Sequence, residues 1–119
     1  MEINWLEQPE EHDYPAASSY LNLIYDTNKV DGIVEKLKES PIIMFKAKDI
    51  FRASGLSLLG VSNYHVKKNL KKIKKGYSIS PILLVRDSSN GKVIIADGFH
   101  RLSAVELYQE DLDIPCKIY

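Results

Sequence analysis

The sequence has one cysteine, no long apolar run and no excess of either charge, and each absence excludes a class of protein. Cys116 alone cannot form an internal disulfide or a zinc site with several thiolates, so a reducing compartment is expected. No stretch approaches the roughly 18 apolar residues of a membrane helix, and the acidic N-terminus is the reverse of a basic signal peptide. We therefore expect a cytoplasmic protein with no membrane partner.

Charge is balanced in total but segregated along the chain. The 16 Lys and Arg residues equal the 16 Asp and Glu residues in number, so overall charge does not favour the coating of nucleic acid or membrane. Residues 1–28 contain six acids and no Lys or Arg, whereas residues 67–75 contain six lysines and no acid. Any binding of a polyanion must therefore be local.

Length and apolar periodicity predict one domain with several short helices. A chain of 119 residues that is 45% hydrophobic can bury one modest core. Asp31 and Asp49 are expected to cap two helices, and Gly76 to end a third in a left-handed conformation. The expected helical ranges are 15–25, 31–39, 49–54, 62–75 and a final helix through 102–108.

Short apolar runs predict the strands. The run 42–45 is too short for a helix and is expected to be a buried strand, followed later by a loop at 56–61 that packs on the core. Residues 82–85 and 92–96, joined by a turn, predict a hairpin. The strand at 114–118 is expected at the sheet edge, because Pro115 cannot donate a ladder hydrogen bond. The predicted fold class is α+β, a small mixed sheet with surrounding helices.

One junction combines features that favour an anion. The strand 93–96 runs into Asp97-Gly98-Phe99-His100-Arg101 and then directly into a helix. Gly98 permits a tight turn, and the free N–H groups of the new helix lie at the positive end of its dipole. His100 and Arg101 add donors that a phosphate accepts. The junction therefore predicts a phosphate site.

A purely structural role fits the spacing of the same residues. Asp97 would then only cap the helix, and Arg101 would pair with a nearby acid such as Glu106. His100 would be a satisfied surface residue. The residues alone leave both interpretations open.

The order of elements over residues 65–118 resembles the ParB/sulfiredoxin-like superfamily. A helix that ends at Gly76 is followed by the proline-led strand Ser80-Pro81-Ile82, a hairpin, the box 97–104 and a strand with Ile114-Pro115. In that superfamily this order builds a small nucleotide-binding domain. The resemblance implies a single domain over 1–119, with 1–40 as an N-terminal helical extension and 41–119 as the superfamily core.

The box separates three branches of that superfamily. Sulfiredoxins carry their catalytic cysteine where Phe99 stands, which excludes thiol chemistry here, and Cys116 lies on another strand. ParB proteins carry Gly-Glu-Arg-Arg at this point, so operator reading by this chain alone is not expected. The free serine kinase branch carries Asp-Gly-His-His-Arg, and this sequence matches it at Asp97, Gly98, His100 and Arg101.

What the resemblance implies is a nucleoside triphosphate, ATP or another, bound with Mg²⁺ at the start of the helix after Gly98. The residues that would contact it are Gly98, Phe99, His100, Arg101, His65, Lys68 and Lys72. Asp97 and His100 would be catalytic, with Asp97 as general base or magnesium ligand. The implied activity is NTP hydrolysis or phosphotransfer to an unknown small-molecule acceptor.

Two other interpretations use the rest of the chain. The lysines of 67–75 could lie against a nucleic-acid backbone, which would make the protein a catalytically inactive module that binds DNA, or they could form only a solvated face. Trp5 and Leu6, among acidic residues, could anchor a protein partner, or Trp5 could fold onto the core.

Overall fold

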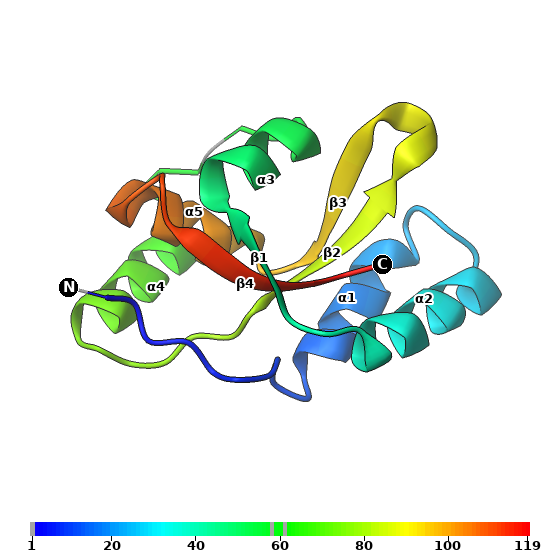
Figure 1. Ribbon diagram of the computed structural model, residues 1–119, viewed down its shortest axis with the longest axis horizontal. Helices are drawn as coiled ribbons and strands as arrows, with labels where there is room; N and C mark the ends of the chain where they lie inside the picture. Colours follow the sequence, from blue (N-terminus) through cyan, green and yellow to red (C-terminus); the bar gives the residue numbers. More distant parts are fainter. Residues whose placement is uncertain (1, 58, 61) are drawn as a thin grey trace.

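The computed structural model describes residues 2–57, 59–60 and 62–119, which form a four-stranded mixed sheet with helices on both faces (Figure 1). The strands are β1 (Ile43–Lys46), β2 (Ile82–Asp87), β3 (Lys92–Asp97) and β4 (Asp113–Ile118), in the spatial order β1-β4-β2-β3. β4 pairs antiparallel with β1 and parallel with β2, and β2 pairs antiparallel with β3. The predicted α+β class is confirmed.

Side chains that alternate along the strands supply a hydrophobic core on each face of the sheet. On one face, Leu83, Val85 and Ala96 pack with α1 (Asp13–Leu21) and α2 (Thr27–Glu39). On the other, Ile82, Leu84 and Ile95 pack with α3 (Ala47–Ser54), α4 (Tyr64–Lys74) and α5 (Phe99–Tyr108). Most of the expected N-terminal extension thus forms one of the two helical layers.

Glycines with a positive φ lie at the predicted hairpin turn and at the predicted end of α4. The hairpin closes through a short 3₁₀ turn at Ser88–Asn90, after which Gly91 adopts a left-handed φ of 64°. α4 is followed by Gly76 at φ 80°, as predicted. Glycine adopts a positive φ without steric cost, and in the hairpin turn the Asp87 carboxylate also accepts hydrogen bonds from Ser89 and Asn90.

The predicted places of two strands in the sheet are wrong. The run at 42–45, expected to be buried, gives the edge strand β1, in which Ile43 is 40% and Met44 53% exposed. The expected edge strand β4 lies between β1 and β2. Its pairing with β2 begins at Cys116, one residue after Pro115, so that ladder requires no hydrogen bond from the proline.

The predicted starts of the first three helices are also wrong. α1 spans Asp13–Leu21, so Pro15 is its third residue, a place where the helix needs no N–H donor. α2 begins four residues before Asp31, because the Asp26 carboxylate caps it by accepting the Lys29 N–H at 2.9 Å. α3 follows β1 directly, with Asp49 inside its first turn.

The segment before α1 lies along the chain between α4 and β2. The Leu6 N–H donates to the Ile79 carbonyl at 2.9 Å, and the Ile79 N–H to the Asn4 carbonyl at 3.0 Å. Trp5 forms the bridge with Ile79 and packs, partly buried, against the protein's own core.

Part of the predicted loop at 56–61 lies outside the described residues, namely positions 58 and 61. Of the rest, Leu59 packs on the core, whereas Leu56 is 46% exposed. In the described part of the chain, no helix combines the length and apolarity that crossing a membrane requires.

Candidate functional site

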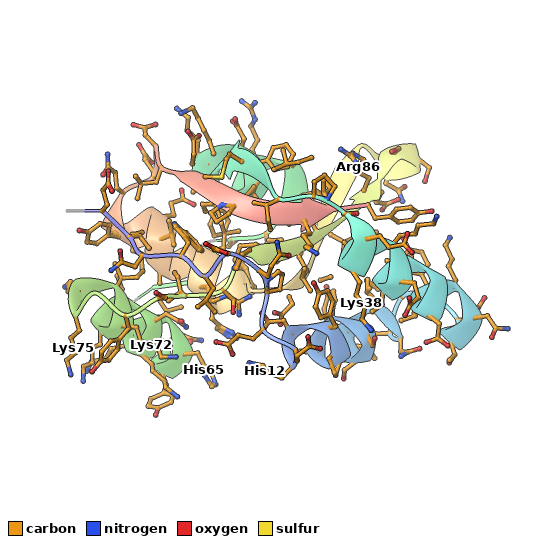
Figure 2. All side chains as sticks on the ribbon, turned by 60° about the horizontal axis from the view of Figure 1, so that its bottom comes forward. His12, Lys38, His65, Lys72, Lys75 and Arg86 are labelled. Atoms are coloured by element: carbon orange, nitrogen blue, oxygen red, sulfur yellow. The ribbon has the colours of Figure 1, made fainter. Side chains whose placement is uncertain are left out.

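A polar cleft of about 200 Å³ lies where the start of α5, one face of α4 and the turn before α1 meet. All three histidines of the chain line it, together with three carboxylates and two cations. Figure 2 shows His65 on α4 and His12 ahead of α1, on the two sides of the space between these helices. The side chains that carry this chemistry are Glu10, His12, Asp13, His65, Lys72, Asp97, His100 and Arg101.

Gly98 joins β3 to α5 at one end of the cleft. Its φ of 106° is in the left-handed region, and a Cβ there would lie 2.6 Å from Ile82 Cδ1 and 2.9 Å from Arg101 Nη2. Among the described residues no side chain caps α5, and its first backbone hydrogen bond runs from the Leu102 N–H to the Gly98 carbonyl at 2.8 Å. Asp97 therefore does not cap this helix, contrary to the purely structural interpretation, and the first N–H groups of α5 are left for other acceptors.

Arg101 ties the start of α5 to the start of β2. Its Nε donates to the Ser80 carbonyl at 3.1 Å, and its Nη2 donates to the Pro81 carbonyl at 3.1 Å and to Asp97 Oδ2 at 3.0 Å. The side chain is only 17% exposed. Its acidic partner is Asp97, not Glu106 as considered from the sequence. Arg101 is therefore a structural anchor of the cleft, with Nη1 as its remaining donor group.

Two carboxylates share this single guanidinium. Asp13 is only 2% exposed, and its Oδ2 lies 3.9 Å from Arg101 Nη2 while accepting the Glu10 N–H at 3.0 Å. Burial raises the pKa of Asp97 above its ordinary value; Arg101 opposes that rise, and Asp13 adds to it. Asp97 accepts a hydrogen bond from Arg101. In this structure that contact makes Asp97 a residue that positions the Arg101 side chain.

The other wall is built by α4 and by His100. His65, Asn69 and Lys72 are spaced by four and three residues and so share one helical face, which lines the cleft. The His65 and His100 rings are 4.8 Å apart between centroids. Burial, with His65 and Arg101 nearby, lowers the pKa of His100. A neutral imidazole in this place can donate or accept a hydrogen bond, and an anion would favour its protonation.

Six of the eight candidate residues named from the sequence come together here, and two do not. Asp97, Gly98, His100, Arg101, His65 and Lys72 all line the cleft. Phe99 instead packs on the core beside Phe51, with ring centroids 6.0 Å apart. Lys68 lines a separate hollow on α4, because it lies about 100° around the helix from Asn69, beyond Lys72.

Sequence reasoning missed the residues that the turn before α1 supplies. Ligand atoms of Glu10, His12 and Asp13 lie within 4.8 Å of one another, and His12 Nε2 is 3.0 Å from Glu10 Oε2 and 3.5 Å from Asp13 Oδ1. This group could hold a divalent cation, whereas the expected magnesium ligand, Asp97, is not part of it. The spacing Glu-x-His-Asp before a helix was the available pattern.

Comparisons with known proteins identify no relative of this chain. No protein-family model, no curated protein and no solved structure matches the chain. The resemblance to the ParB/sulfiredoxin-like superfamily therefore stays a prediction, and function is inferred from the cleft.

Proposed function

We propose that the cleft binds the phosphate groups of a nucleoside triphosphate, ATP or another. The observation that carries this proposal is that the uncapped start of α5 opens on the cleft that His65, Lys72 and His100 line. Free N–H groups at a helix start, joined by cationic and imidazole donors, are typical of phosphate sites. The Asp97-Gly98-x-His100-Arg101 resemblance supports the same ligand.

The size of the cleft limits which part of the nucleotide enters. Its volume of about 200 Å³ is below the roughly 300–1,000 Å³ of sites that enclose a whole small molecule. The phosphates would therefore occupy the cleft, and the nucleoside would lie at its mouth.

The acidic side of the cleft fits the magnesium ion that accompanies such nucleotides. Glu10 and Asp13 offer the carboxylate oxygens that Mg²⁺ prefers, and these two residues would hold it. When bound, the ion neutralises phosphate charge. Asp97 fits this role less well, because it is not part of the cluster of ligand atoms that Glu10, His12 and Asp13 form.

The enzymatic part of the proposal is that the protein is a phosphotransferase or an NTPase. His100 is the candidate general base of this reaction. Phosphoryl transfer depends mainly on positioning and on the neutralisation of charge. Lys72 and His65 would orient the phosphates. His100, whose pKa is lowered, would accept the proton of a small-molecule hydroxyl or of water. Asp97 would act through Arg101.

Calorimetric titration of ATP, CTP and GTP with Mg²⁺ into the purified chain tests the binding. Lys72→Ala should weaken the nucleotide that binds best by about tenfold, the loss of one charge-assisted hydrogen bond. Lys74→Ala is the matched control, because Lys74 lies on the same helix outside the cleft. Absence of binding by every nucleotide, or an equal loss in the control, would contradict the proposal.

Release of inorganic phosphate tests the enzymatic part separately. The nucleotide that binds best should be hydrolysed slowly without an acceptor, and His100→Ala should abolish the release. Binding without any phosphate release, with or without candidate acceptors, would leave a nucleotide-binding module rather than an enzyme.

A further inference from the structure

α4 presents three different faces to its surroundings. At 100° per residue, Val66, Leu70 and Ile73 point to the core, and His65, Asn69 and Lys72 point to the cleft. The third face, called here the lysine face, consists of Tyr64, Lys67, Lys68, Lys71 and Lys74. Figure 2 shows His65, Lys72 and Lys75 in order along the helix.

The lysine face is hollowed rather than flat. One hollow of about 300 Å³ is lined by Lys67, Leu70, Lys71 and Lys74, and a second of about 210 Å³ by Tyr64, Lys67, Lys68 and Lys71. The two hollows share Lys67 and Lys71, so they adjoin along the helix. Among the residues that the structure describes, no acidic one lines either hollow.

No ion pair among the described residues engages these lysines. In residues 2–57, 59–60 and 62–119, ion pairs engage Lys38, Lys46 and Lys48, but none involves a lysine of α4. The pair Lys67 and Lys71, four residues apart, places like charges side by side, which disfavours a helix. The helix dipole favours lysines in the last turn but not Lys67 and Lys68.

Exposed aromatic side chains lie at both ends of this basic helix. Tyr64 at its start is 70% exposed, and Tyr77 just after its end is 59% exposed. α4 has 11 residues and is about 16 Å long, which matches about five stacked nucleotides at about 3.4 Å each. Bases of any sequence stack on such rings, whereas paired bases in a duplex do not offer their faces.

We infer that the lysine face binds single-stranded nucleic acid, with backbone phosphates on Lys67, Lys68, Lys71 and Lys74 and a base stacked on Tyr64. Charge complementarity selects a polyanion, and the exposed rings select a single strand over a duplex. The inference does not rest on the nucleotide proposed for the cleft, because the two sites use different faces of α4.

Fluorescence anisotropy with a labelled 12-mer of oligo(dT) and the full chain tests this inference. The affinity should fall as the salt concentration is raised from about 50 mM, with a slope of log K against log salt of about −3. This slope is the value for four phosphate contacts to a single strand. The triple variant Lys67→Gln, Lys68→Gln, Lys71→Gln should lose at least tenfold in affinity, and its slope should fall in magnitude by about 2.

A matched control removes three lysines elsewhere. The variant Lys29→Gln, Lys36→Gln, Lys38→Gln on α2 changes the net charge equally and should bind as the unchanged protein does. All of the lysines replaced in both variants are exposed, so both should fold, which circular dichroism checks. Equal losses in the two variants would show an unspecific charge effect and overturn the inference.

The stacking part has its own test. Tyr64→Ala should weaken oligo(dT) binding by at least about fivefold, the low end for loss of one stacked base. Tyr20→Ala, which removes an exposed tyrosine of α1, should leave binding unchanged. A duplex of equal length that binds as tightly as the single strand, or no binding by the unchanged protein, would overturn the inference.

Discussion

Replacing Arg101 by alanine tests whether its guanidinium holds the cleft together. The side chain donates hydrogen bonds to the carbonyls of Ser80 and Pro81 and to the carboxylate of Asp97. Alanine would leave the Asp97 carboxylate without this donor, and the buried Asp13 without the guanidinium that lies 3.9 Å away. We therefore expect the substitution to lower stability as well as any ligand affinity.

The expected loss follows from the charges left behind. Removing one partner of a buried ion pair costs roughly 3–5 kcal/mol, and a hydrogen bond to a charged group contributes roughly 1.5–3 kcal/mol. Because the Arg101 side chain keeps 17% exposure, we take the lower end, a loss of about 3 kcal/mol in the free energy of unfolding. At roughly 4 °C per kcal/mol for a domain of this size, Tm should fall by about 12 °C.

Urea unfolding followed by the fluorescence of Trp5, the single tryptophan, measures this loss. Arg86→Ala is the matched control, because Arg86 lies exposed on β2, and it should change stability by less than about 0.5 kcal/mol. Adding Asp97→Asn to Arg101→Ala should recover part of the loss by removing one unpaired charge. If Arg101→Ala were no less stable than Arg86→Ala, the anchoring role would be refuted.

Three further predictions concern single residues. Gly98→Ala should destabilise by about 1–3 kcal/mol more than Gly91→Ala, because both force alanine to a positive φ but only the first meets Ile82; equal losses in urea titrations would contradict this. Since burial lowers the pKa of His100 below 6.5, its contribution to stability is complete above pH 6.5 and is lost as the pH falls through the lowered value. His100→Asn should therefore flatten the fall in unfolding free energy below pH 6.5, and an unchanged profile would refute the assignment. Burial raises the pKa of Cys116 to about 12, so a thiol reagent should label it far more slowly in the native protein than in urea, and fast native labelling would contradict that burial.

Local features of the chain were the ones that its sequence predicted well. The hairpin of β2 and β3, the end of α4 near Gly76 and the direct passage from β3 through Gly98 into α5 all depend on neighbouring residues. Helix starts were predicted less well, because several acids near a start compete for the cap. Asp26, not Asp31, caps α2.

Contacts between side chains of different elements were not predictable in the same way. Asp97 and Arg101 are four residues apart, yet the spacing fitted Glu106 as a partner too, and burial beside Asp13 decides the pairing. The turn at residues 10–13 contributes to the cleft only because α1 packs on the sheet face next to β3. No local pattern carries that information.

The sequence by itself determined the elements, the basic helix and the glycine-led junction between β3 and α5, because backbone preferences and apolar periodicity act over a few residues. Only the tertiary structure decided that β4 lies inside the sheet and β1 at its edge, since strand order depends on packing between distant segments. The same packing brings His12, His65 and His100 from three segments into one cleft, and it separates the cleft face of α4 from its lysine face.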